Sequence, residues 1–230
     1  MNIKQRLIAL RPALLIAAGA LLLAAAPSAG AGAIPNPAVD APLAVATAPQ
    51  QSAVFAGGCF WGVQAVFEHV RGVKDAIAGY AGGPAAQADY VSVSRGGTGH
   101  AESVRVDYDP SKISYGRLLK IFFAVAHDPT ELNRQGPDVG TQYRSVIFVA
   151  DDQQRRIASA YLAELQQDKA FPEPIVTRID PLTGFYPAEY YHQHFVARHP
   201  DNPYVVINDL PKLRRLKALF PALYRSTGPD

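Results

Sequence analysis

The sequence has a single cysteine, Cys59, among its 230 residues, and a single tryptophan, Trp61. One cysteine excludes an internal disulfide bond. The N-terminus, described below, has the features of an export signal, and exported proteins are the class in which disulfides are common. An unpaired thiol in such a chain is therefore the first candidate for chemistry.

The chain also has little excess charge of either sign. It has 22 lysines and arginines against 20 aspartates and glutamates, but Lys4, Arg6 and Arg11 lie within the first 33 residues. Without that segment the basic count falls to 19. No basic stripe remains, which argues against a nucleic-acid partner. The rest of the chain has no internal repeats or low-complexity stretches.

Residues 1–33 have the composition of a secretory signal peptide. A basic start precedes an apolar run from Pro12 to Ala26, and small residues at 29–33 offer cleavage sites. The run has about 15 residues, fewer than the roughly 20 that a membrane-spanning helix needs. We therefore expect export, to the periplasm, with no stable membrane insertion after the signal is removed.

The remainder reads as one domain. Residues 34–52 are rich in proline and alanine without periodicity, which predicts a flexible lead-in. Residues 53–225 are enough for a domain with its own core, and 226–230 form a tail. Helical patterns alternate irregularly with short strands along this part of the chain. Two of the helical patterns follow N-cap candidates, Ser114 and Asp151. This predicts an α+β fold, a two-layer sandwich with helices packed on a mixed or antiparallel sheet.

Cys59 lies where the spacing of apolar residues changes from a continuous run to a helical pattern. A short apolar run, 53–56, precedes it, and Val63, Val66, Phe67 and Val70 follow at helical spacing. This pattern predicts a strand-to-helix junction with Cys59 in the first helical turn. Free N–H groups there favour an anion, and therefore the reactive thiolate. The alternative is a cysteine buried as a small apolar residue, which would not need glycines on both sides.

Other local signals are weaker. The loop 96–100 is glycine-rich, but no Lys-Ser or Lys-Thr follows it, so it is a poor phosphate loop. The spacing of three residues, Glu189, His192 and His194, is similar to that of a metal site. If they lie on a helix, however, the side chains of His192 and His194, two positions apart, point in different directions. We expect a structural or polar-network role for them, with no metal bound, and we expect Tyr80 to pack in the core.

Three motifs in order closely resemble peptide methionine sulfoxide reductase A: Gly-Cys-Phe-Trp-Gly at 58–62, Gly-His-Ala-Glu at 99–102 and Gly-Thr-Gln-Tyr-Arg-Ser at 140–145. His-Asp-Pro at 127–129 and Tyr-His-Gln at 191–193 add to the resemblance, which runs from about 54 to 224. It implies reduction of the S epimer of methionine sulfoxide, free or in oxidised proteins, without a metal or organic cofactor.

The resemblance also implies roles for residues of this chain. It assigns the nucleophile to Cys59, the apolar cage for the substrate methyl to Phe60 and Trp61, the acid to Glu102, the oxygen-binding phenols to Tyr90 and Tyr143, and a substrate contact to Asp138. Each has a plainer alternative. Glu102 would be an exposed charge at the start of a strand, the tyrosines would be ordinary half-buried residues, and Asp138 would cap its own turn.

The chemistry of a sulfoxide needs residues of these types. A thiolate attacks the positive sulfur only if the departing oxygen is neutralised by a proton donor and by hydrogen-bond donors. Glu102 donates near neutral pH only if burial raises its pKa, whereas the phenols of Tyr90 and Tyr143, with an ordinary pKa of about 10, are protonated already. Fixed methyl and oxygen pockets on opposite sides of Cys59 would select one epimer.

The chain differs from many family members because it has no second cysteine to resolve the sulfenic acid. Its tail, 201–213, is similar to the single-cysteine branch of the family. Regeneration must then come from an external thiol, either thioredoxin-like, glutaredoxin-like or small.

Three other functions remain open from the residues alone. A single-cysteine peroxidase would also form a sulfenic acid, but no Thr-x-x-Cys run precedes Cys59. A papain-like hydrolase would need a histidine and an asparagine or aspartate in the downstream half. A non-catalytic module that grips methionine between Phe60 and Trp61 would not need the thiol.

Overall fold

The computed structural model describes residues 34–227. The predicted signal peptide, 1–33, and the last three residues lie outside this range. Among the residues described, no helix is both long and apolar enough to cross a membrane.

Strands and helices alternate irregularly along the chain. The strands are β1 (Gln51–Gly57), β2 (Val73–Ala81), β3 (Ala101–Tyr108), β4 (Arg134–Gln135), β5 (Asp138–Val139), β6 (Ser145–Val149), β7 (Arg178–Pro181) and β8 (Phe185–Pro187). The α-helices are α1 (Phe60–Glu68), α2 (Tyr90–Ser94), α3 (Tyr115–Ile121), α4 (Asp152–Gln167), α5 (Phe195–Arg198) and α6 (Leu210–Leu219). Short 3₁₀ turns cover Ala85–Gln87, Thr141–Tyr143 and Tyr190–His192, and π-helical turns cover Phe122–Ala126 and Val205–Asp209.

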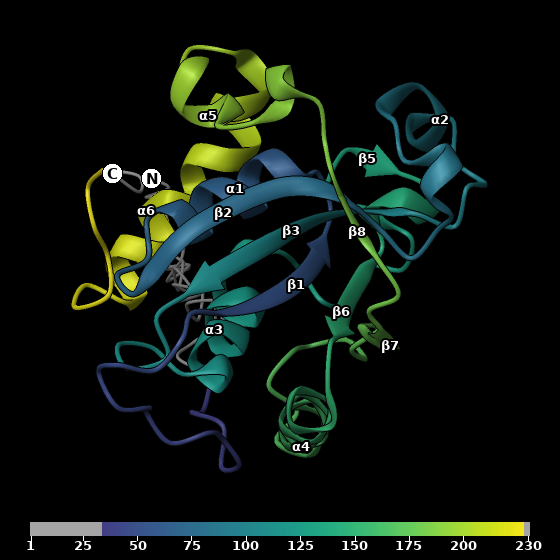
Figure 1. Ribbon diagram of the computed structural model, residues 1–230. Helices are drawn as coiled ribbons and strands as arrows, with labels where there is room; N and C mark the ends of the chain where they lie inside the picture. Colours follow the sequence, from purple (N-terminus) through teal and green to yellow (C-terminus); the bar gives the residue numbers. More distant parts are fainter. Residues whose placement is uncertain (1–33, 228–230) are drawn as a thin grey trace, which may run out of the picture. The chain divides into compact units, whose positions relative to one another are not determined.

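The main sheet has six strands in the order β7-β6-β1-β3-β2-β8 (Figure 1). Neighbouring strands are antiparallel except for β6 and β7, which are parallel. The long strands β1, β3 and β2 lie at its centre. The predicted mixed sheet is therefore confirmed.

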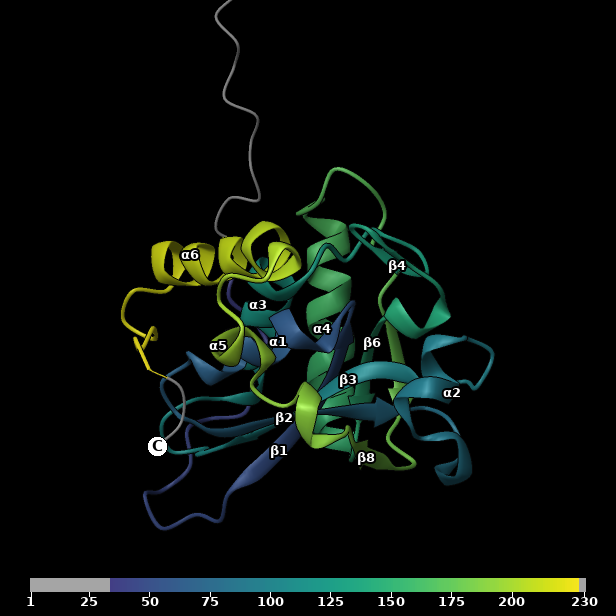
Figure 2. The same ribbon diagram turned by 90° about the horizontal axis from the view of Figure 1, so that it is seen from above.

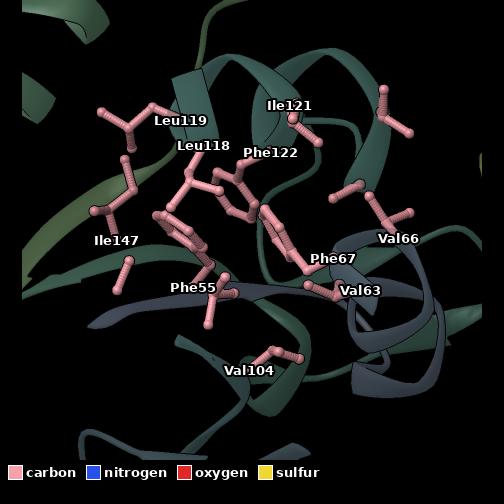
Figure 3. Close-up of a cluster of buried hydrophobic side chains, with 14 of the residues drawn as sticks. Phe55, Val63, Val66, Phe67, Val104, Leu118, Leu119, Ile121, Phe122 and Ile147 are labelled. Atoms are coloured by element: carbon pink, nitrogen blue, oxygen red, sulfur yellow. The ribbon is translucent and has the colours of Figure 1, made fainter. Parts of the chain in front are cut away.

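Alternate residues of β1 face different clusters. Ala53 and Phe55 belong to the main core, whereas Val54 and Ala56 belong to a smaller cluster on the other face. Phe55 stacks on Phe67 of α1, with ring centroids 5.3 Å apart, and on Phe122 after α3 at 5.0 Å (Figure 3). Helices α1, α3 and α4 all contribute to the main core, and Figure 2 shows them beside the strands. This is the two-layer α+β arrangement that the sequence predicts.

The helix caps follow the local sequence. Ser114 accepts the backbone N–H of Arg117 at the start of α3, and Asp151 accepts that of Gln154 at the start of α4. Such side chains satisfy N–H groups that the first turn of a helix leaves without a partner.

The lead-in, predicted to be flexible, is held against the domain by specific contacts. Ile34 is buried in the main core, and the carbonyl of Pro35 accepts a hydrogen bond from the phenol of Tyr161. Asp40 accepts the N–H of Gly116 at 2.8 Å. The prediction came from composition alone. It missed that the first turn of α3 needs acceptors and that Asp40 supplies one.

Candidate active site

Cys59 lies at the junction between β1 and α1, as the period change predicts. It is the N-cap residue of α1. Gly58 makes the turn with a φ of +88°, and a Cβ there would lie 2.5 Å from the side chain of Gln135. Both the backbone conformation and the available space therefore require glycine before the cysteine.

Glu102 lies on the central strand β3 and is 2% exposed. Its Oε2 accepts the backbone N–H of Phe60 at 3.0 Å, which connects the carboxyl to the first residue of α1. Burial raises the pKa of Glu102 to about 8, against smaller opposing effects of the hydrogen bonds from Phe60 and Cys59. The carboxyl is therefore protonated at neutral pH, the state in which a carboxyl can donate a proton.

The thiol of Cys59 behaves differently from the sequence prediction. Burial, and then the charge of Glu102, raise its pKa well above the ordinary value, while the backbone N–H of Trp61 lowers it. A helix N-terminus contributes about 0.3–1 kcal/mol. Burial shifts a pKa by up to about 3–5 units, each of about 1.4 kcal/mol. Desolvation is therefore the larger effect, and in the free protein the thiol is protonated at neutral pH.

Tyr90 and Tyr143 approach the same centre from two other elements. Tyr90 opens α2, and Tyr143 ends the turn Thr141–Tyr143. Burial raises the pKa of both phenols, and the charges of Glu102 and Cys59 raise them further. Both phenols therefore keep their protons at working pH. Residues from four different elements thus lie within electrostatic reach of one another.

The two residues predicted to form the methyl cage are placed differently. Phe60 is 1% exposed and packs on Tyr80 and His192, with ring centroids 5.8 and 5.0 Å away. Trp61 is half-buried and stacks on Phe195 at 3.7 Å. The indole of Trp61 therefore presents some apolar surface to solvent, whereas the Phe60 ring is buried, and both rings contact His192.

His192 fixes the orientation of Trp61. Its Nδ1 accepts the indole Nε1–H at 3.1 Å, and its ring contacts that of Tyr90 at 4.4 Å. Because an indole only donates, His192 must be neutral with its proton on Nε2. Burial lowers the pKa of His192, which favours that neutral form.

The fluorescence of Trp61, the only tryptophan, is expected to report the protonation of His192. Lowering the pH through a midpoint below 6.5 protonates Nδ1, breaks the bond to the indole and shifts the emission. His192→Gln is expected to remove this transition while the chain stays folded. A midpoint above 6.5, or a transition unchanged in the variant, would contradict the assignment.

Asp138 on β5 lies beside a residue that sequence reasoning missed. Its carboxylate accepts a hydrogen bond from the phenol of Tyr204. Burial, and then the charge of Cys59, raise the pKa of Tyr204, so this phenol also lies near the thiol. The Asn-Pro-Tyr run at 202–204 lay inside the tail that supported the family resemblance, and no local pattern identified Tyr204 itself.

The residues that imitate a metal site point to separate partners. His194 pairs with Glu68 at 2.6 Å, and His192 accepts from Trp61. Glu189 accepts from the phenol of Tyr80 and from the N–H of Tyr90, both at 2.9 Å. Within residues 34–227 no group of three or more His, Cys, Asp or Glu is arranged to hold a metal ion. Glu189 therefore anchors the start of α2, where Tyr90 lies.

Gly62 in the first turn of α1 is covered by the C-terminal segment. A Cβ added there would overlap Oδ1 of Asp209 and lie 2.7 Å from Nζ of Lys212. Gly62→Ala is therefore expected to lower the free energy of unfolding by about 1–3 kcal/mol through overpacking. Denaturant unfolding would measure the loss, and a variant as stable as the parent would contradict this packing.

Comparisons with known proteins show which family the chain is similar to. The family model described as "Peptide methionine sulfoxide reductase" matches residues 51–222. Peptide methionine sulfoxide reductase MsrA 2 of Mesorhizobium japonicum is 58% identical over 174 residues, which cover 76% of this chain and 89% of the relative. The MsrA 2 protein of Synechocystis is 53% identical over 188 residues, or 81% of this chain and 88% of the relative.

Solved structures share the fold. Reduced Mxr1 from Saccharomyces cerevisiae aligns with a TM-score of 0.62 at 34% identity, over 68% of this chain and 89% of that one. Methionine sulfoxide reductase A of Corynebacterium diphtheriae aligns with a TM-score of 0.56, also at 34% identity, over 68% of this chain and 78% of that one. With the family model covering most of its length and relatives above half identity, the chain belongs to the peptide methionine sulfoxide reductase family.

Proposed function

We propose that this chain reduces the S epimer of methionine sulfoxide, free or within oxidised proteins, through a sulfenic acid on Cys59. Membership of the family makes it an oxidoreductase that reduces methionine sulfoxide and repairs oxidised proteins. The epimer, the catalytic residues and the route of regeneration follow from the arrangement of the site and the sole cysteine.

In the proposed step the sulfur of Cys59 attacks the sulfoxide sulfur and a bond forms between the two sulfurs. Glu102 protonates the sulfoxide oxygen, and the proton that the thiol gives up returns to Glu102. The S–O bond of the sulfoxide then breaks as the hydroxyl moves to Cys59, the S–S bond breaks, and methionine leaves as the thioether. The Cys59 sulfur is oxidised by two electrons and the methionine sulfur is reduced by two, so no metal or organic cofactor is needed.

Glu102 is the proposed proton donor, with Tyr90 and Tyr143 as hydrogen-bond donors to the departing oxygen. The observation that carries the proposal is a carboxyl that burial keeps protonated, bonded to the first N–H of the Cys59 helix. When Glu102 transfers its proton to the sulfoxide oxygen, its carboxyl becomes a carboxylate. Donors preorganised in this way contribute about 3 kcal/mol each in other enzymes.

Trp61 and Phe60 are the proposed cage for the substrate methyl, and Asp138 a contact to the substrate. The half-buried Trp61 supports the first role, because its stacking on Phe195 and its bond to His192 hold the indole in place. The short bond from Tyr204 orients the carboxylate of Asp138.

Regeneration is proposed to use an external thiol. The sole cysteine leaves no internal partner for the sulfenic acid. One thiol displaces water from Cys59 to form a mixed disulfide, and a second releases Cys59 and leaves as a disulfide. A thioredoxin-like or glutaredoxin-like protein in the periplasm would fit the proposed export signal, which cell fractionation of the tagged full-length chain would test.

The test is a single turnover without any thiol. The reduced protein is mixed with an excess of a peptide carrying racemic methionine sulfoxide, and both are followed by mass spectrometry. We expect one oxygen on Cys59, one equivalent of methionine formed, and only the S epimer consumed. Repeated turnover without a thiol, or consumption of both epimers, would contradict the proposal.

A further inference from the structure

The C-terminal segment places a buried ion pair beside the first turn of α1. Asp209 ends the π-helical turn Val205–Asp209 and is 0% exposed, and the Lys212 side chain, on the first turns of α6, is 18% exposed. Oδ1 of Asp209 and Nζ of Lys212 are 3.5 Å apart. Val205 and Leu213 belong to a small hydrophobic cluster that includes Ala65 of α1, which holds this segment in place.

Both charged groups lie against Gly62, three positions after Cys59. Oδ1 of Asp209 occupies the space where a Cβ of Gly62 would stand, and Nζ of Lys212 lies 2.7 Å from that point. Only a residue without a side chain allows them to approach so closely. The pair therefore contacts the same helical turn that begins at the thiol.

The charges of this pair act on Cys59 in opposite directions. Asp209 raises the pKa of the thiol, and Lys212 lowers it by the smaller amount. Lys212 also lowers the pKa of His127, whose ring lies 2.9 Å from a Cβ placed at Gly57, just before the cysteine. The effects on Cys59 and His127, together with the contact at Gly62, locate the ammonium at this end of α1.

The other titratable groups around the thiol come from separate elements. They are Glu102 on β3, Tyr90 on α2, Asp138 on β5, Tyr143 on its 3₁₀ turn, Tyr204 before the π-helical turn, His127 after α3 and His192 beside Phe60. Each is an acid, a phenol or a histidine, and burial favours the neutral form of both Glu102 and His127. Lys212 is thus the lysine positioned to favour an anionic sulfur.

We propose that Lys212 is a positioning residue for this reaction: its ammonium, held at Gly62 by Asp209, stabilises the thiolate of Cys59 at the moment of attack. The role rests on the proposed function, since it concerns the nucleophile of that reaction. It also gives the cysteine-free C-terminal segment a part in the chemistry. Burial opposes ionisation of the sulfur, and a cation beside the first turn of α1 offsets part of that effect.

The test measures how fast iodoacetamide alkylates Cys59 as a function of pH. The chain has no other cysteine, so the total label reports this thiol alone. Lys212→Met is expected to raise the midpoint by a fraction of a pH unit and to slow alkylation at pH 7 about twofold, because the charge of Lys212 is a smaller effect on the thiol than burial or the charge of Asp209. Asp209→Asn is expected to move the midpoint the other way.

Two controls separate charge from packing. Lys212→Arg keeps the cation and is expected to restore most of the wild-type profile. Lys217→Met makes the same change at an exposed position of α6 and is expected to leave the profile unchanged. Because the charge of Glu102 also raises the pKa of the thiol, the series is repeated in a Glu102→Gln background, where that charge is absent.

Opposite shifts in the two variants would support the proposal, because a general loosening of the site would move both midpoints in one direction. Equal shifts, or an unmoved Lys212→Met profile in a folded protein, would overturn it. If Asp209→Asn does not fold, the proposal is judged from the alkylation profiles of Lys212→Met and Lys212→Arg. Alkylation needs no sulfoxide, so a wild-type protein that fails to reduce sulfoxide would overturn the proposed function and leave this test intact.

Discussion

Cys59→Ser is expected to lower kcat/KM for methionine sulfoxide by at least about 10⁴-fold, as removal of a nucleophile does in other enzymes. A serine hydroxyl is a poor nucleophile without an adjacent base, and the chain has no other cysteine to take over. Methionine formation from a sulfoxide peptide, measured with dithiothreitol as reductant, gives the rate.

Folding has to be unchanged for this loss to be informative. Cys59 is buried and the serine is nearly its size, so thermal unfolding of the variant should resemble that of the parent. Binding of the sulfoxide peptide should persist, because Trp61 remains in place. A folded variant that forms methionine at the wild-type rate would contradict catalysis by the thiol.

Glu102→Gln is expected to lower kcat about 10²–10⁴-fold, the usual contribution of a positioned proton donor. Glutamine has nearly the same shape and can still accept the N–H of Phe60, so the loss would report the proton rather than the packing. Glu173→Gln, the same change at an exposed position, is expected to keep full activity.

The pH profile gives this prediction its sign. A proton donor with a raised pKa of about 8 is active below that value. Wild-type activity is therefore expected to fall as the pH rises through about 8, whereas Glu102→Gln should lack that alkaline limb. An identical alkaline limb in the two proteins would assign the titration to another group and contradict the role of Glu102.

Local features of this fold could be predicted from the sequence because they depend on neighbours along the chain. The change of apolar period around Cys59 predicts the junction of β1 and α1, and Ser114 and Asp151 cap the helices that follow them. The position of Glu102 could not be derived in this way. Its contact with Phe60 depends on the register of β3, and only the family motif indicated it.

The features that sequence reasoning missed depend on contacts between distant segments. The thiol was expected to ionise easily from its place at a helix start, but burial by other elements is the larger effect. Residues 204–212 show only part of a helical pattern of apolar residues, and that pattern does not predict which part of the fold they contact. Their approach to Gly62 brings Asp209 and Lys212 beside the first turn of α1. Asp40 accepts an N–H of the first turn of α3 from a segment whose composition predicted only a flexible lead-in.

The protonation of Glu102 is the point on which the proposed chemistry depends. An infrared difference spectrum between wild type and Glu102→Gln, taken across a pH series, would observe it directly. We predict a protonated carboxyl band at pH 7 that disappears as the pH passes about 8. A carboxylate band already present at pH 7, with no protonated form, would contradict the account.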